Sequence, residues 1–318
     1  MWLYVLERVL RTLITLFLAV TLIFFAVRVL PGDPAEALMG RHMSAEGLET
    51  LRRQMGLDVP VWDQYLQFLG NLLRGDLGIS LALGQPVSKL LWDVAPYTAI
   101  VVVGAMLIGA AIGIPAGILS AIHRNRAIDY LARFISLSGI SLPGFVIAIL
   151  LMLPLAVYLG WFPMVGGGRT DSPASLVHFG FLPALAGGIG MAAYLTRLTR
   201  STYLDILNED YIRTARAKGL SDRRVLYKHA LRNALIPIVT LLGIYSIIMI
   251  GDSIAIEIVF SRPGFGRLIM GGITQRDYVV LQSVLLVYVA FAAIVNLVVD
   301  LLYVLIDPRI KLGRIHGD

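Results

Sequence analysis

Long runs of apolar, uncharged residues limit most strongly how this chain can fold. Of its 318 residues, 57% are hydrophobic and 15% are charged, whereas a soluble domain is usually about 25% charged. The apolar residues are concentrated in continuous stretches, such as the uncharged segment from Val94 to Ile122. A run of 18 or more such residues is long enough to cross a bilayer as a helix. The sequence therefore predicts an all-α integral membrane protein.

Six segments of this kind are present, and we expect each to form one transmembrane helix. They run from about Val9 to Leu30, Tyr97 to Ser120, Phe134 to Tyr158, Gly180 to Thr196, Ala234 to Glu257 and Val279 to Ile306. Pro143 and Pro154 predict a kink in the third. We interpret the first as an uncleaved span, because it is longer than a signal-peptide core and no small-residue cleavage site follows it.

The basic residues predict the orientation of these spans. If the N-terminus is cytoplasmic, the short inner segments hold seventeen Lys and Arg residues, and the two short outer loops hold four. Basic residues accumulate on the cytoplasmic side of a membrane protein. We therefore expect a multi-pass protein of the bacterial inner membrane with both termini in the cytoplasm.

The long segment between the first two spans has a helical pattern of its own. Apolar residues recur at helical spacing, which predicts two amphipathic helices outside the membrane. These residues are Leu48, Leu51, Met55, Tyr65, Phe68, Leu69 and Leu72. The pattern leaves open whether the helices form only a lid over the spans or a docking surface for another protein. The expected organisation is a first span (1–30), an extracytoplasmic helical loop (31–95), a membrane core of five spans (96–306) and a cytoplasmic tail (307–318).

The composition argues against several classes of function. The chain has no cysteine, and its five histidines are scattered without helical metal-ligand spacing. It has no phosphate-binding Gly-x-x-x-x-Gly-Lys-Ser/Thr loop. The spans contain no pair of aspartates, no Ser–His pair and no His-Glu-x-x-His motif, as an intramembrane hydrolase would need. We therefore expect no catalytic site, no cofactor, no bound metal and no nucleic-acid partner.

The inner loop between the fourth and fifth spans, about residues 208–233, is the most informative segment. Its sequence predicts a short helix capped by Asn208, a left-handed stop at Gly219, and a second helix that Ser221 caps and that ends near Asn233. Nine basic residues lie between Arg197 and Arg232. The residues alone leave two interpretations equally open: a segment that a partner protein grips, or an amphipathic helix on anionic lipid.

This loop resembles the "EAA" coupling loop of binding-protein-dependent ABC importers, in the form typical of peptide and nickel permeases. The resemblance rests on the residues from Asp210 to Leu220 and from His229 to Ala234. The general importer pattern has Glu-Ala where Arg213 and Thr214 stand and a proline where Arg232 stands. These departures are usual in the peptide branch. Further similar motifs occur in the same order along the chain: Pro31–Pro34, Gly56–Asp58, Gly75–Ser80, Gly113–Pro115, Phe260–Gly266 and Asp307–Arg309.

The resemblance implies a type I ABC importer permease fold and a subunit that moves short peptides, such as dipeptides or oligopeptides, inward. Glutathione or nickel chelates are alternative cargoes of the same class. A more distant alternative is a secondary transporter that works without an ATPase. The implied partners are a second permease, two ATPase subunits and an extracytoplasmic solute-binding protein. The implied ATPase-coupling residues are Tyr211, Thr214, Ala215, Ala217, Lys218, Gly219, His229 and Arg232.

Polar residues inside the spans are candidates for a gate or a substrate path, because a charge is costly in the bilayer. Asp252 and Glu257 lie in the outer half of span five, pointing about 140° apart. Either could meet cargo, or both could be structural partners of Arg262 or another basic group. Two serines of span three, Ser138 and Ser141, could line a polar path or bond back to their own helix. In span six, Asn296, Asp300 and Tyr303 lie close together, and we expect them to pair with Arg11.

Overall fold

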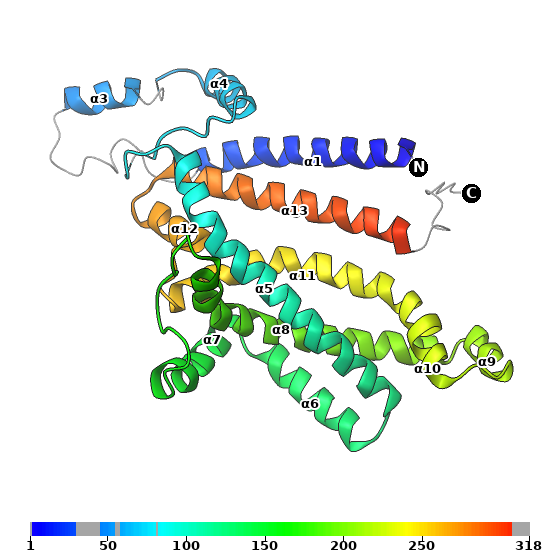
Figure 1. Ribbon diagram of the computed structural model, residues 1–318. Coiled ribbons are helices and arrows are strands. Elements are labelled where there is room, and N and C mark those ends of the chain that lie inside the picture. Colours follow the sequence, from blue (N-terminus) through cyan, green and yellow to red (C-terminus); the bar gives the residue numbers. More distant parts are fainter. Residues whose placement is uncertain (1, 30–44, 55–57, 81, 307–318) are drawn as a thin grey trace. The chain divides into compact units, whose positions relative to one another are not determined.

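The computed structural model describes residues 2–29, 45–54, 58–80 and 82–306 (Figure 1). Two compact units are formed. The first holds the described residues of Met1–Thr12, Tyr97–Arg262 and Ile294–Asp318, and the second those of Leu13–Pro96 and Pro263–Ala293. Three of the sequence motifs lie wholly or partly outside the described residues: Pro31–Pro34, Gly56–Asp58 and Asp307–Arg309. The expected tail, residues 307–318, lies outside them as well.

Five helices are long and apolar enough to cross a membrane, which confirms five of the expected spans. They are α1 (Trp2–Val29), α5 (Val87–Ile122), α8 (Pro173–Leu207), α11 (Leu231–Val259) and α13 (Tyr278–Ile306). Several extend well past the apolar run that predicts them. A helix satisfies its backbone hydrogen bonds internally, so it need not end where the charged residues begin.

The third expected span is broken rather than gently kinked. It consists of α6 (Ala127–Ser141) and α7 (Gly144–Met152), which continues as a π-helical turn from Leu153 to Tyr158. The two parts are bent by 105°. Leu142 is extended, with φ −99° and ψ 127°, because the ring of Pro143 disfavours a helical conformation in the preceding residue. The prediction of a kink at Pro143 is confirmed, with a sharper bend than expected.

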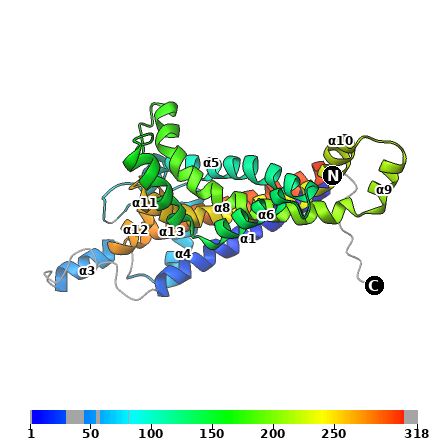
Figure 2. The same ribbon diagram turned by 90° about the horizontal axis from the view of Figure 1, so that it is seen from below.

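The bent pair still crosses the first unit only once. In Figures 1 and 2, α5 ends and α8 begins at opposite ends of this unit. The intervening α6 and α7 must therefore carry the chain from one end to the other. Counted as one span, the pair brings the number of spans in the described residues to six.

Helix α8 lies at the centre of the first unit and packs closely against α5. Gly104, Gly109, Gly113 and Gly117 of α5 all face α8. A Cβ atom added at Gly117 would lie 2.6 Å from Cβ of Thr199, and one at Gly104 would lie 2.8 Å from Cβ of Ala184. Small residues let two membrane helices approach until their backbones are nearly in contact.

The second unit contains the helices of the long loop. Helices α3 (Ala45–Gln54) and α4 (Val61–Leu73) confirm the two amphipathic helices that the apolar spacing predicts. Tyr65 of α4 is buried, and its hydroxyl lies 2.7 Å from the Thr21 hydroxyl of α1. Phe68 stacks on Phe24 of α1, with 5.2 Å between ring centroids. These contacts fix α4 on the second half of α1.

A buried aspartate organises the rest of the second unit. Asp277 lies between α12 (Phe265–Thr274) and α13, and its carboxylate accepts hydrogen bonds from the Ser80 hydroxyl at 2.6 Å and from the backbone N–H of Val280 at 3.2 Å. The second bond satisfies an N–H group in the first turn of α13. Asp277 thus ties the segment before α5 to the start of the last span.

Candidate functional site

The helix–glycine segment predicted between spans four and five is present as α9 (Asp210–Ala217). It has two different faces. Ile212 and Ala215 are buried against the chain itself. Thr214 and Ala217 are exposed, as are Lys218 and Gly219 beyond its end. The outer face therefore carries small side chains beside the exposed Tyr211, Arg213 and Arg216.

The end of α9 has the predicted left-handed glycine. Gly219 has φ +80°, and its N–H donates to the Arg216 carbonyl at 2.9 Å. The Leu220 N–H donates to the Ala215 carbonyl at 3.3 Å, which completes a glycine-terminated helix end. A Cβ atom at Gly219 would meet nothing within 4 Å. The backbone conformation, rather than lack of space, is therefore what favours glycine here.

One predicted cap is wrong, and the other is confirmed in position only. Asn208 ends α8, and its side-chain amide donates to the Leu204 carbonyl at 2.9 Å. Glu209 is the N-cap of α9 and makes no side-chain capping bond. Ser221 is the N-cap of the second helix, as predicted, but it makes no side-chain capping bond either. The capping residue is hard to place from sequence, because Asn, Glu and Asp are adjacent and all suit a helix start.

The second helix of the loop does not end near Asn233. It begins as α10 (Asp222–Arg224), continues through a π-helical turn (Val225–Ala230), and runs without interruption into α11. The helical run from Asp222 to Val259 is 38 residues long. His229 is half-buried and Arg232 is exposed on this run. The loop is therefore joined rigidly to span five.

Side-chain contacts connect α9 with this long helix. The Asn233 amide donates to the Tyr211 hydroxyl at 2.6 Å, and Arg216 lies 3.5 Å from the Asp222 carboxylate. The buried Tyr203 of α8 donates its hydroxyl to the Leu226 carbonyl at 3.1 Å. Together with the packing of the buried Ile212 and Ala215, these contacts hold α9 against the start of the long helix.

At the other end of the first unit, Glu257 belongs to a buried polar cluster with Thr98 and Arg262. The Thr98 hydroxyl donates to the Glu257 carboxylate at 2.6 Å. Arg262 and Glu257 attract each other electrostatically, and both side chains are fully buried. Burial lowers the pKa of the Arg262 guanidinium, and the charge of Glu257 opposes that shift.

Arg262 also contacts two further segments. Its Cζ atom lies 5.4 Å from the ring centroid of Tyr97, and its Nε and Nη2 donate long hydrogen bonds to the carbonyls of Tyr97 and Leu176, at 3.4 and 3.5 Å. Its Nη1 makes no hydrogen bond within the described residues. This cluster connects the ends of α5, α8 and α11, which favours a structural role for Glu257.

The other polar residues of the spans are placed differently. Asp252 is half-buried and lies two helical turns from Tyr245, so the two share one face of α11. Ser138 and Ser141 are exposed on α6, and the Ser141 hydroxyl donates to the Leu137 carbonyl at 2.8 Å. The structure does not bring these serines together with Asp252 in one cavity of the described residues.

The expected pairing of Asp300 with Arg11 is wrong. Asp300 pairs with Arg8 at 2.9 Å, whereas Arg11 pairs with Glu7 on its own helix. Residues 8 and 11 lie on the same face of α1, so the sequence could not distinguish them. Tyr303 instead contacts the Thr240 hydroxyl of α11 at 2.7 Å.

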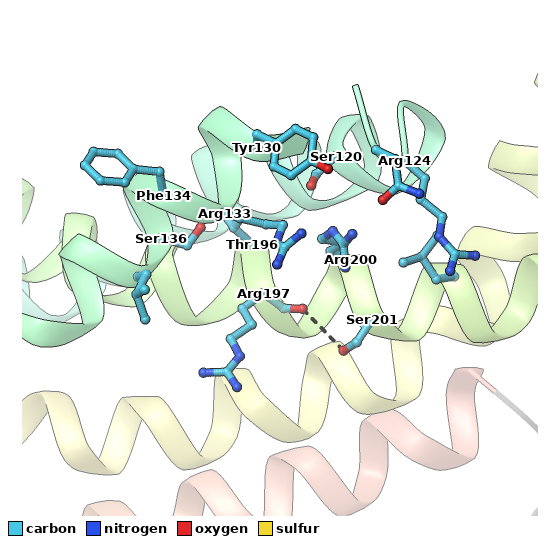
Figure 3. A pocket seen from close by; sticks show the side chains of 13 residues that line it. Ser120, Arg124, Tyr130, Arg133, Phe134, Ser136, Thr196, Arg197, Arg200 and Ser201 are labelled. Carbon is cyan, nitrogen blue, oxygen red and sulfur yellow. Dashed lines mark hydrogen bonds between the residues drawn. The ribbon is translucent and has the colours of Figure 1, made fainter. Parts of the chain in front are cut away.

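Sequence reasoning also missed one buried ion pair. The Arg200 guanidinium donates two hydrogen bonds to the Asp129 carboxylate, at 2.6 and 2.8 Å. Asp129 also accepts from the Ser120 hydroxyl and from the backbone N–H of Asn125 (Figure 3 shows this region). The signal available was a single acid in the basic segment from Arg124 to Arg133. Its partner is 71 residues away, so sequence distance concealed it.

The membrane-crossing helices and the exposed helix–glycine segment define a multi-pass membrane protein with an exposed short helix at one end. The chain belongs to the binding-protein-dependent transport system inner membrane component family, whose model matches residues 113–312. A second model, for the N-terminal part of these membrane components, matches residues 1–101. The chain is thus the multi-pass inner-membrane permease of an ATP-driven importer. It is not an enzyme, and separate subunits bind the solute and hydrolyse ATP.

Individual relatives are similar along almost the whole chain. The glutathione transport system permease protein GsiC of Escherichia coli O6:H1 strain CFT073 is 41% identical over 308 residues, which cover 97% of this chain and 98% of the relative. The GsiC proteins of Escherichia coli K12 and Shigella boydii serotype 4 are 40% identical over the same length and with the same coverage.

A solved structure shares the fold. The inward-facing MetNI methionine ABC transporter matches with a TM-score of 0.55 at 19% identity, over 69% of this chain and 96% of the matched chain. The similarity confirms the predicted type I importer permease fold.

Proposed function

We propose that this permease imports glutathione or similarly short peptides. The observation that supports this cargo best is the 41% identity to a glutathione permease over 97% of this chain. Nickel chelates remain the other cargo of the same branch. Family membership disfavours the ATPase-independent alternative, because these membrane components work with separate ATPases.

We further propose that α9 is the part of the permease that an ATPase subunit grips. Its outer face offers Thr214 and Ala217, and Gly219 lets the chain reverse directly behind them. Tyr211 and Lys218 are exposed on α9 and just beyond its end, His229 and Arg232 lie on the long helix that follows, and Ala215 is buried on the inner side of α9. A lipid-bound helix would instead expose large apolar residues, and the exposed face of α9 between Asp210 and Ala217 carries mostly polar and small ones.

Movement of the ATPases would then be transmitted to the membrane through the continuous helix from Asp222 to Val259. At about 1.5 Å per residue, a helix of 38 residues is longer than the bilayer is thick. A displacement of α9 at one end therefore tilts span five as a whole. Alternating access follows if this tilt opens the path toward one side while it closes the other.

A second, related permease would complete the path. Ser138 and Ser141 are exposed in the mostly apolar second half of α6, where lipid is a poor neighbour for hydroxyl groups. We propose that they and Asp252 face the path between the two permeases. Glu257 would then have a structural role and hold the ends of α5, α8 and α11 together.

The proposed topology places α9 and both termini in the cytoplasm and the segment 31–95 outside, with the core at 96–306 and the tail at 307–318. Because the native chain has no cysteine, single cysteines at Ser172, Ser221 and Ser261 can test it. A membrane-impermeant thiol reagent added outside should label the first and third variants and spare the second. Labelling of the Ser221 variant in intact cells would disprove the orientation.

The coupling proposal is tested by Ala217→Arg, which adds bulk and charge to the exposed face of α9 without disturbing its buried side. The matched control is Ala217→Ser, which keeps the residue small. We expect the arginine variant to insert normally but to lose co-purifying ATPase and uptake of labelled glutathione, and the serine variant to keep both. Normal uptake by Ala217→Arg would disprove the coupling proposal. If the wild-type permease takes up nickel but not glutathione, the proposed cargo changes and the coupling proposal stands.

A further inference from the structure

A large cavity lies in the first unit, between the end of α5, the first half of α6 and the second half of α8 (Figure 3). Its volume is about 860 Å³, within the range of sites that hold small ligands. Four arginines line it, together with aromatic and hydroxyl side chains: Arg124, Arg133, Arg197, Arg200, Tyr130 and Phe134. None of the functions proposed above uses this cavity.

The charge of the cavity is not balanced. Arg200 is neutralised by Asp129, whose carboxylate is already saturated by four hydrogen bonds. No acidic side chain is among the described residues that line the cavity, and no ion pair within the described chain involves Arg124, Arg133 or Arg197. Arg133 instead lies over the Tyr130 ring, with its Cζ atom 5.8 Å from the ring centroid. The site therefore favours an anion.

The cavity wall is also partly apolar. Figure 3 shows Arg133 and Arg200 extending into the same part of the cavity, whereas Arg197 extends away from them. One helical turn along α6 from Tyr130 and Arg133, Phe134 and Leu137 are 70% and 62% exposed. A small hydrated anion would make no favourable contact with these apolar side chains. A molecule with a negatively charged head and a hydrocarbon tail satisfies both parts of the wall.

We propose that this cavity binds the phosphate headgroup of an anionic phospholipid, with an acyl chain lying along Phe134 and Leu137. The guanidinium of Arg133 holds the phosphate, because arginine forms paired hydrogen bonds with phosphate oxygens, and Arg124 adds a second unpaired positive charge to the cavity wall. Basic pockets between transmembrane helices on the cytoplasmic side are suited to such headgroups. Arg200, fixed by Asp129, supplies the rigid floor of the site.

The test is a lipid titration of the full-length chain in nonionic detergent, with bound lipid counted by native mass spectrometry. The probes are phosphatidylglycerol and phosphatidylcholine with identical acyl chains. We expect the wild type to prefer phosphatidylglycerol, and the double variant Arg124→Gln, Arg133→Gln to bind it about 25-fold more weakly, at about fivefold per arginine. Binding of phosphatidylcholine should be unchanged, which separates loss of the site from loss of the fold.

The matched control is Arg126→Gln, which removes an exposed arginine from the same turn of chain but outside the cavity. It should keep the lipid preference. An equal loss in the control would overturn the proposal in favour of a diffuse positive surface. Displacement of the lipid by glycerol phosphate at equal concentration would show that the cavity takes a soluble phosphate, and displacement by glutathione would show that it belongs to the cargo path. Either outcome would overturn the lipid assignment and leave the transport proposal intact.

Discussion

The two polar regions at opposite ends of the first unit, α9 and the cluster of Thr98, Glu257 and Arg262, carry their charges in opposite ways. In α9 the charged side chains are exposed, and their contacts are few. In the cluster, the glutamate and the arginine are fully buried, and their contacts join three helix ends. Exposed charges interact weakly with their neighbours, so a binding partner can replace those contacts at little cost in free energy. A buried charge that loses its partner is strongly destabilising. The comparison supports the proposal that α9 interacts with a partner protein, and it favours a structural role for the cluster.

The largest expected effect breaks the buried side of this comparison. Arg262→Met would leave the Glu257 carboxylate buried without its cation, and removal of one partner from a buried pair costs about 3–5 kcal/mol. We expect a marked fall in the unfolding temperature of the full-length permease in detergent. Arg267→Met, which removes an exposed arginine of α12, serves as the control and should unfold as the wild type does. Equal unfolding temperatures for both variants would contradict the structural role of Arg262.

A smaller effect is expected at the hydroxyl that completes the same cluster. Thr98→Val keeps the shape of the side chain but removes the 2.6 Å hydrogen bond to Glu257. A hydrogen bond to a charged group contributes about 1.5–3 kcal/mol. The unfolding temperature should fall by less than in Arg262→Met, and Thr98→Ser should restore most of it. If Thr98→Ser unfolds at the same temperature as Thr98→Val, packing rather than the hydrogen bond explains why threonine stabilises this position.

The exposed side of the comparison should show loss of function with little loss of stability. Gly219→Val forces a β-branched residue into a left-handed conformation, at a cost of roughly 1–2 kcal/mol. This strain acts on the end of α9 alone. We expect cargo uptake in membrane vesicles to fall while the unfolding temperature barely changes. Gly219→Asn, which tolerates this conformation better, should keep most of the uptake; an asparagine variant as impaired as valine would argue against backbone strain.

The smallest effect concerns the contact between α9 and the long helix. Tyr211→Phe removes the 2.6 Å hydrogen bond from Asn233, and an exposed bond of this kind contributes about 0.5 kcal/mol. We expect faster amide hydrogen exchange in residues 210–217 and unchanged exchange in α8. Exchange rates identical to the wild type would show that this hydrogen bond does not hold α9 in place.

What the sequence could predict depends on how far apart along the chain the interacting residues lie. The spans, the two helices of the segment 31–95 and the left-handed Gly219 depend on residues within a few helical turns, and the structure confirms them. Their hydropathy, periodicity and turn chemistry are local properties.

The polar contacts were less accessible because they join distant segments. Thr98 and Glu257 are 159 residues apart, and Asp129 and Arg200 are 71 apart. Asp300 shows the finer limit: the sequence indicated a basic partner on the first span, but a choice between Arg8 and Arg11 requires the rotation of one helix against another. The continuity of α11 with the loop was missed because a local cap signal at Ser221 says nothing about where the helix ends.

The glycine seam between α5 and α8 restricts how the permease can move. Side chains added at Gly104, Gly109, Gly113 or Gly117 would collide with α8 at 2.6–2.8 Å, and surfaces that fit this closely cannot slide past one another without separating first. We therefore expect the two helices to move as one body during a transport cycle. A cross-link between α5 and α8 should therefore leave transport running, whereas one across the α6–α7 corner, where the chain bends by 105°, should stop it.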